Sequence, residues 1–169
     1  MMSYLAQAMT SEGASHPAAE AVVRAYIAAL NAHDLEAAYG LVASDCLRHI
    51  GWREVRFPDA PGQSPPERSW RACPDWRYDV QAIVAAGDLV ALMVRASGTH
   101  TGGPQDLPGW GSFPATGRPL RAAWSCVYRV SAGKIVEQWQ TIDSLLTLGD
   151  LGALPTNDRP ARQFASNAE

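Results

Sequence analysis

The chain has 169 residues, of which 47% are hydrophobic and 18% charged, and its formal net charge is −3 at pH 7. This length and composition suit a single globular domain with one core. The charge and the lack of a basic stripe argue against nucleic acid as a partner. No apolar run approaches the roughly 20 residues that a membrane span needs. The first residues lack the pattern of a secretory signal, so we expect a cytoplasmic protein without membrane contact.

The cysteines argue against a metal or redox site. The chain has three of them, Cys46, Cys73 and Cys126. Their wide spacing matches no CxxC pattern, so we expect reduced, mostly buried thiols. For the whole chain we expect a lead-in over residues 1–14, a single domain over 15–155 and a polar tail over 156–169.

The first part of the domain has the spacing of helices. Residues 15–32 carry apolar side chains three and four positions apart, among them Tyr26. After a break at NAHD, Asp34 can cap a second short helix that includes residues 35–42. The two helices would form a hairpin with one apolar side.

An irregular part follows. Residues 46–50, CLRHI, could be a short strand or an extended exit from the second helix. Residues 51–76 are rich in Pro, Gly and Arg, and a loop of this length is often a lid or a binding segment. Within it, Ser64-Pro65-Pro66-Glu67 has the form of a capping box and predicts a brief helix near residues 65–73.

From residue 77 the hydrophobic period changes to two, which is typical of strands. Turn signals at Gly87-Asp88 and Ala132-Gly133 divide this part into two hairpins and predict a four-stranded antiparallel meander. A short last helix follows. Helices followed by strands indicate an α+β fold, in which a curved antiparallel sheet is covered by the amino-terminal helices and a pocket lies between the two layers.

The alternation of the third strand places Leu120, Ala122, Trp124, Cys126 and Tyr128 on its buried face. A two-residue turn at Ala132-Gly133 would set Tyr128 opposite Glu137, Cys126 opposite Trp139, Trp124 opposite Thr141 and Ala122 opposite Asp143. A three-residue turn would invert this facing. In the second strand the outward position of Arg95 turns His100 inward. The two-residue turn therefore brings His100, two tryptophans and Asp143 to one face.

Five motifs occur in an order that is found in one family. They are Pro-Asp before a strand, Ala-Gly-Asp at the hairpin, Gly-Thr-His-Thr-Gly at a strand end, Ala-Thr-Gly-Arg-Pro, and Gly-Lys-Ile-x-Glu-x-Trp-x-x-x-Asp. With the helical part, the chain over roughly residues 17–155 resembles the SnoaL-like polyketide cyclase family, also called ester cyclases. This family belongs to the nuclear transport factor 2-like superfamily, so the resemblance implies a cone-shaped α+β fold.

The resemblance also implies a reaction. It is an intramolecular aldol ring closure on a hydrophobic polyketide ester, without cofactor or metal, with an aspartate as general acid/base. Relatives in the superfamily isomerise ketosteroids, dehydrate, open epoxides or only bind a small molecule, and these remain alternatives. A homodimer or higher homo-oligomer is also implied. Many members carry an aspartate directly after the tryptophan, where this chain has Gln140, so either this position or Asp143 matches the catalytic aspartate.

Candidate roles follow from these patterns. Asp143 is the expected general acid/base, held in a poorly hydrated site beside Trp124 and Trp139, with an N-cap of the last helix as the alternative. His100 would hydrogen-bond a substrate carbonyl, or be a strand-end histidine bonded to a neighbouring carbonyl. A buried Glu137 would pair with Tyr128. The expected substrate-binding residues are Trp124, Trp139, Tyr128, Leu120, Cys126, Gln140, His49 and Tyr26. The histidines and Asp143 lack the spacing of a metal site.

Overall fold

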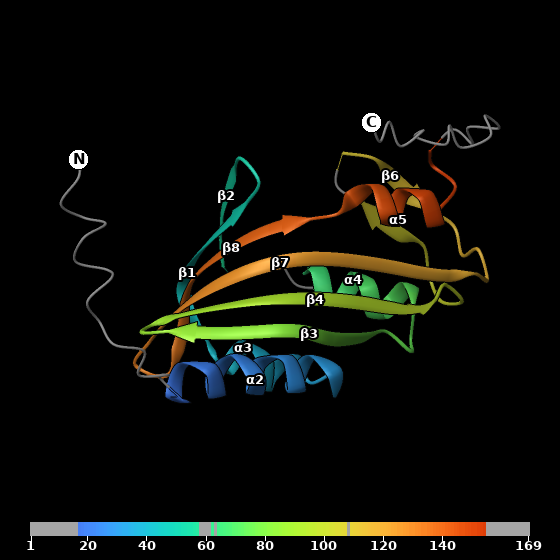
Figure 1. The fold of residues 1–169 in the computed structure, drawn as a ribbon. Coiled ribbons are helices and arrows are strands. Elements are labelled where there is room, and N and C mark those ends of the chain that lie inside the picture. The colour runs from blue at the N-terminus through green and yellow to red at the C-terminus, as the bar shows by residue number, and fades with distance from the viewer. Residues whose placement is uncertain (1–16, 58–61, 63, 108, 155–169) are drawn as a thin grey trace, which may run out of the picture.

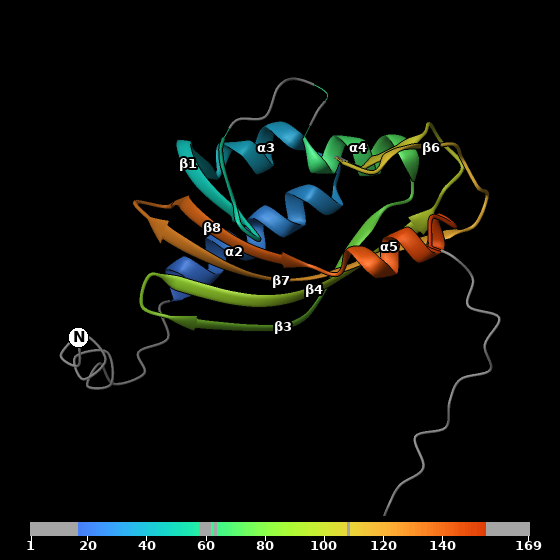
Figure 2. The same ribbon diagram turned by 90° about the horizontal axis from the view of Figure 1, so that it is seen from above.

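The computed structural model describes residues 17–57, 62, 64–107 and 109–154, and the expected lead-in and polar tail lie outside them. The helices are α2 (Pro17–Asn31), α3 (Leu35–Gly40), α4 (Pro65–Ala72) and α5 (Ser144–Asp150). The strands are β1 (Val42–Ile50), β2 (Arg53–Arg56), β3 (Arg77–Ala86), β4 (Leu89–Thr99), β5 (Gln105–Leu107), β6 (Gly111–Phe113), β7 (Pro119–Ser131) and β8 (Lys134–Ile142). A curved six-stranded sheet has the order β2-β1-β8-β7-β4-β3, and α2 and α3 lie on one side of it (Figures 1 and 2). This arrangement confirms the predicted α+β fold.

The two amino-terminal helices form the predicted hairpin. α2 buries Val23, Ile27 and Leu30, which recur three and four positions apart. Asp34 caps α3, because its carboxylate accepts a hydrogen bond from the backbone N–H of Ala37 at 2.9 Å. None of the helices in the described part of the chain has the length and hydropathy to cross a membrane.

The segment after α3 is a strand. α3 ends at Gly40, and Val42 begins β1, which pairs in parallel with β8. The prediction that the second helix includes residues 41 and 42 is wrong, because a β-branched residue beside an available strand edge packs better in the sheet. Of the two alternatives for residues 46–50, the strand is confirmed, and β2 adds an antiparallel strand beyond it.

Local turn and cap signals are confirmed. Gly87 and Gly133 sit in the two hairpin turns with φ of 62° and 74°, a region that glycine enters without steric cost. At the start of α4, the Ser64 hydroxyl accepts a hydrogen bond from the backbone N–H of Glu67, and the Glu67 carboxylate accepts one from the backbone N–H of Ser64. The predicted meander is present as β3, β4, β7 and β8.

The pairing of β7 with β8 follows the predicted register for only two residues. Ser131 faces Lys134 and Val130 faces Ile135, after which a β-bulge shifts the pairing by one residue. The predicted pairs beyond this point are wrong. The observed pairs are Arg129 with Glu137, Tyr128 with Gln138, Cys126 with Gln140 and Trp124 with Ile142. Because side chains alternate along a strand, the one extra residue turns the odd-numbered side chains of β8 to the other face.

The core lies between the helices and the sheet face that they cover, which we call the inner face. β4 and β7 contribute much of this core: Val90, Leu92, Val94, Ala96, Leu120, Cys126, Tyr128 and Val130. Of the β7 residues predicted to be buried, Leu120, Cys126 and Tyr128 are buried, and Ala122 and Trp124 are half-buried. The opposite face, which we call the outer face, carries the exposed side chains of Val84 and Met93. The two faces therefore offer different chemistry, and each predicted site residue has to be assigned to one of them.

Candidate functional site

Five aromatic side chains gather on the inner face, and we call them the interior cluster: Tyr26, Trp76, Tyr78, Trp124 and Tyr128. Tyr26 of α2 meets Tyr128 of β7 edge to face, with ring centroids 6.0 Å apart. Tyr78 of β3 contacts Trp76 and Trp124 edge to face, at 6.5 Å and 5.8 Å. The cluster thus joins a helix, two strands and the residue before β3. It confirms that Tyr26, Trp124 and Tyr128 share one side of the sheet.

The polar groups of the interior cluster are hydrogen-bond donors. Burial is the main cause that raises the pKa of Tyr26, Tyr78 and Tyr128, so these hydroxyls keep their protons at neutral pH. The indole N–H of Trp76 is buried and has no hydrogen-bond partner within the described residues, although it lies near Tyr78. Carbonyl oxygens of a ligand could accept hydrogen bonds from these groups.

Amide and thiol groups extend the interior cluster along β7 and β8. Cys126 lies opposite Gln140 and beside Tyr128, and burial raises the pKa of its thiol to about 12. A thiol with so high a pKa is neutral and unreactive at neutral pH. Gln138, opposite Tyr128, is buried as well. The inner face therefore carries a neutral amide at position 140.

All three cysteines are free and buried, as predicted. Burial raises the pKa of both Cys46 and Cys73 to about 11, so these thiols also stay protonated. Across the described ranges, no group of three His, Cys, Asp or Glu side chains lies close enough together to hold a metal ion.

The burial of side chains next to the interior cluster decreases toward the end of β8. Along the inner face of β8, Gln138 is buried, Gln140 is half-buried and Ile142 is 43% exposed. On β7, Tyr128 is buried and Trp124 is half-buried. We call this end the mouth of the interior cluster.

Asp143 directly follows this mouth, but it is exposed to solvent. Its Oδ1 accepts a hydrogen bond from the backbone N–H of Leu146 at 3.1 Å, so Asp143 is the N-cap of α5. The expectation of a buried carboxylate between Trp124 and Trp139 is wrong, because the bulge turns Trp139 to the outer face and β8 ends one residue before Asp143. The alternative of a helix cap is confirmed.

His100 is fully buried and lies at the end of β4, on the side that was predicted. Its Nε2 lies 3.2 Å from the carbonyl oxygen of Gly103, and its Nδ1 lies 3.4 Å from Oγ1 of Thr116. Both ring nitrogens therefore face atoms of the protein. This geometry matches the alternative of a strand-end histidine bonded to a neighbouring carbonyl.

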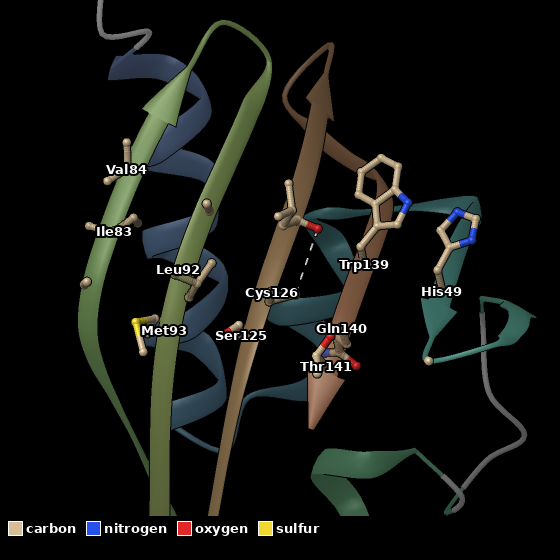
Figure 3. Close-up of a pocket in the computed structure, with 14 residues that line it drawn as sticks. His49, Ile83, Val84, Leu92, Met93, Ser125, Cys126, Trp139, Gln140 and Thr141 are labelled. Atoms are coloured by element: carbon tan, nitrogen blue, oxygen red, sulfur yellow. Dashed lines mark hydrogen bonds between the residues drawn. The ribbon is translucent and has the colours of Figure 1, made fainter. Parts of the chain in front are cut away.

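His49 and Trp139 lie side by side on the outer face, with α2 behind the strands (Figure 3). Their rings are stacked, with centroids 5.3 Å apart and an interplanar angle of 7°. His49 Nε2 lies 2.9 Å from Oε1 of Glu137, and Nδ1 lies 3.6 Å from Oε1 of Glu54. The predicted pairing of Glu137 with Tyr128 is wrong, and so is the inward position of Trp139, because the bulge reverses their facing.

Two adjoining hollows of about 480 and 430 Å³ mark the outer face. They share Met93, Ser125 and Thr141, three of the side chains that Figure 3 shows in front of the strands. Trp139 and His49 close one end, and Asp143 lines the other. Both hollows are shallow parts of this face, and the expected pocket between the layers stays a prediction.

Three inner-face residues were missed by the sequence reasoning. Tyr78 and Val80 are two positions apart in β3, so they point to the same face of the sheet. This alternation could have identified Tyr78 from the sequence. Trp76 lies in the irregular segment before the strand and carries no periodic signal. Arg48 is only 7% exposed and lies over the ring of Phe57 at 5.9 Å, but β1 was too weakly predicted for its facing to be assigned.

Comparisons with known proteins agree on one family. The family model of SnoaL-like polyketide cyclases matches residues 20–151. AclR of Streptomyces galilaeus, a candidate hydroxylase, is 28% identical with a TM-score of 0.71, over 83% of this chain and 100% of AclR. IdmH of Streptomyces antibioticus, a candidate polyketide cyclase, is 31% identical with a TM-score of 0.60, over 79% of this chain and 98% of IdmH. A nuclear transport factor 2-like protein of Burkholderia thailandensis shares the fold. It is 24% identical with a TM-score of 0.61, over 79% of this chain and 96% of that protein. No curated protein matches the chain.

Proposed function

Because the chain belongs to the SnoaL-like polyketide cyclase family, we propose that it is a cofactor-independent enzyme that carries out acid/base chemistry on a hydrophobic polyketide-like carbonyl compound. The reaction is an aldol-type cyclisation. The observation that carries this proposal is the interior cluster, whose aromatic rings suit a flat apolar ligand and whose donors suit its carbonyl oxygens.

Asp143 is the proposed general acid/base. Its Oδ1 caps α5, which leaves the second carboxylate oxygen for a substrate at the mouth of the interior cluster. The carboxylate would remove a proton from a carbon between two carbonyl groups, and the resulting enolate carbon would attack a second carbonyl of the same molecule. The proton would then return to the new alkoxide oxygen, so the reaction needs no oxidant or reductant.

A non-catalytic binding protein is the second candidate. It is favoured by the exposed, helix-capping position of Asp143 and by the neutral amide of Gln140 on the inner face. An isomerase, a dehydratase or an epoxide-opening enzyme would use the same interior cluster and would differ in product.

The substitution Asp143→Asn separates these functions, because asparagine caps a helix about as well as aspartate but cannot act as a base. With an aromatic polyketide ester that carries a 1,3-dicarbonyl group, we expect kcat/KM to fall about 10²–10⁴-fold while thermal stability stays unchanged. Product structure by mass spectrometry and NMR identifies the reaction. Asp143→Ala is the matched control for the cap and should also lose about 1 kcal/mol of stability.

Two results would count against the proposed function. Unchanged turnover in Asp143→Asn would remove this residue from the mechanism. A carbonyl ligand that raises the melting temperature of all three proteins and is recovered unaltered would establish the binding protein instead.

We infer that the chain forms a homodimer through the outer face. The side chains of Val84 and Met93 are 66% and 57% exposed there, and Ala82 and Ala91 lie beside them. An apolar surface of this kind is rarely left in water on a monomer. The two helices leave this face of the sheet uncovered, so a second copy can approach it face to face (Figures 1 and 2).

A further inference from the structure

We propose that Trp52 is an anchor of the homodimer, and that in each copy its indole ring packs against the partner's Ala82 and the partner's Val84. This inference rests on the dimer through the outer face and names the contact that holds the two edges of that interface. It gives a partner to a tryptophan that has none within its own described chain.

The first support is the position of Trp52. Gly51 and Trp52 form the turn between β1 and β2, and Gly51 has a φ of 60°, which is typical of the first position of a tight hairpin turn. The side chain of Trp52 is fully exposed, at 104%. In Figure 1 the hairpin stands up at the edge of the sheet, away from α2 and α3. A tryptophan that projects in this way is typical of an interface anchor.

The second support is a row of residues that crosses the outer face at the level of this turn. The backbone N–H of Gly51 donates a hydrogen bond to the carbonyl oxygen of Gln140 at 3.3 Å. From the next residue of β8 the row continues through directly paired positions of β8, β7, β4 and β3: Thr141, Ser125, Met93 and Ala82. Trp52 therefore lies at one end of the row, and the apolar side chains of β3 lie at the other end.

The third support is that the two ends of this row are complementary. In a dimer with a two-fold axis, every contact occurs twice with the two copies exchanged. An axis through Ser125, in the middle of the row, places the hairpin turn of each copy over β3 of the other copy. β3 is an edge strand, and on the outer face it carries the exposed side chains of Ala82 and Val84, of which Val84 is 66% exposed. An indole ring at one end thus meets an apolar strand at the other.

The fourth support is the area that this contact adds to the interface. A tryptophan side chain buries about 150–250 Å² when it is covered, so the two symmetric contacts bury about 300–500 Å² of tryptophan surface. A stable interface buries about 1,200–2,000 Å² in total. The share of Trp52 is therefore large enough for its removal to change the dissociation constant of the dimer.

The test measures this dissociation constant by sedimentation equilibrium. Trp52→Ala should weaken the dimer roughly 30-fold or more, the threshold for an interface anchor. Trp110→Ala is the matched control, because Trp110 is also exposed, at 59%, and also follows a glycine of positive φ in a hairpin turn, between β5 and β6. It should leave the dissociation constant unchanged. Both side chains are exposed, so both variants should keep the circular dichroism spectrum of the wild type.

A double-variant cycle identifies the surface that Trp52 contacts. Trp52 and Val84 belong to opposite edges of the sheet and are too far apart to touch within one copy. Their effects on the dissociation constant would therefore multiply if they acted at separate places in the interface. We expect Val84→Ala to weaken the dimer as well. The double variant Trp52→Ala/Val84→Ala should weaken it by less than the product of the two single effects, because both truncations remove the same contact between copies.

The outcomes separate this inference from the proposed dimer and from the proposed enzyme activity. A monomeric wild type would refute the dimer and the Trp52 contact together. A dimer that Trp52→Ala leaves unchanged would refute the contact while the dimer stands. Effects of Trp52→Ala and Val84→Ala that simply multiply would refute β3 as the surface that Trp52 contacts. None of these measurements involves a substrate, so failure of the proposed reaction would leave them unaffected.

Discussion

At position 98 the chain has room for a hydrogen atom and nothing larger. A Cβ on Gly98 would lie 2.7 Å from the Cβ of Cys73 and 3.1 Å from the Cα of Trp76. At Gly102 a Cβ would lie within van der Waals overlap of the carbonyl oxygen of Arg71. The glycines around His100 therefore let the end of β4 pack directly onto the segment that carries Trp76 into the interior cluster.

Gly98→Ala tests this contact. We expect a loss of about 1–3 kcal/mol in the free energy of unfolding, because the obstructing atoms belong to buried side chains and backbone that cannot move aside easily. Gly40→Ala is the control, since no atom lies within 4 Å of its added Cβ and alanine favours the helix. Urea denaturation measures both. Equal stability of the two variants would show that residues 73–76 yield readily to the new methyl group.

Among the elements, four strands and a turn are linked by a row of polar and charged side chains across the outer face. The row comprises Glu54 of β2, His49 of β1, Glu137 of β8, Arg129 of β7 and Asp88 of the turn between β3 and β4. The successive nitrogen–oxygen distances are 3.6, 2.9, 3.3 and 2.9 Å. Because β1 and β2 are linked to the rest of the sheet through the pairing of β1 with β8, these contacts help to hold that parallel pairing in place.

The stability of the protein should therefore depend on the ionisation of Glu137. The hydrogen bond from His49, and then that from Arg129, hold the pKa of Glu137 below its usual 4.5. With a lowered pKa in the folded state, the stabilisation is present above about pH 4.5 and is lost as the pH falls through the lower folded value.

Glu137→Gln should lower the free energy of unfolding near neutral pH by about 1 kcal/mol, and it should have a smaller effect in acid, where the wild-type carboxylate is protonated. Urea denaturation at several pH values measures this. Glu36→Gln, an exposed position in α3, is the control and should change little. A Glu137→Gln effect that is the same at every pH would mean that the charge is not what matters.

For the whole molecule, the inner and outer faces of the sheet differ in the side chains that they carry. The inner face holds the interior cluster under α2, and the outer face presents apolar side chains to a second copy in the proposed dimer. In the proposed function and the proposed dimer, one face of the sheet serves the ligand and the other face serves the second copy. This arrangement also leaves the mouth of the interior cluster at the end of β8, beside the exposed Asp143.

Met93→Lys tests the proposed dimer. Met93 is 57% exposed in the middle of the outer face, where a lysine would place like charges close together across a two-fold interface. We expect a dimer for the wild type and a monomer for the variant by size-exclusion chromatography with light scattering. Ala25→Lys, at an exposed position of α2, should remain dimeric. A monomeric wild type, or a dimeric Met93→Lys, would refute this interface.

Local patterns were sufficient for the helices α2 and α4, the turns at Gly87 and Gly133, and the buried face of β4 and β7. Each of these depends on residues within a few positions of one another, so periodicity and capping chemistry are readable directly. The motif order likewise identified the family, because it is a property of the chain and needs no coordinates.

Long-range contacts decided the facing of β8 and the composition of the site. A single bulged residue moved Trp139 and Glu137 to the outer face and Gln140 to the inner one. No local sequence signal marks such a bulge. The lost ladder hydrogen bond is offset by strand pairing and by packing on both faces of the sheet, and these contacts involve residues far apart in the sequence. For the same reason, Trp76 joined the inner side only when the irregular segment before β3 packed on the sheet, and Arg48 only when β1 paired with β8.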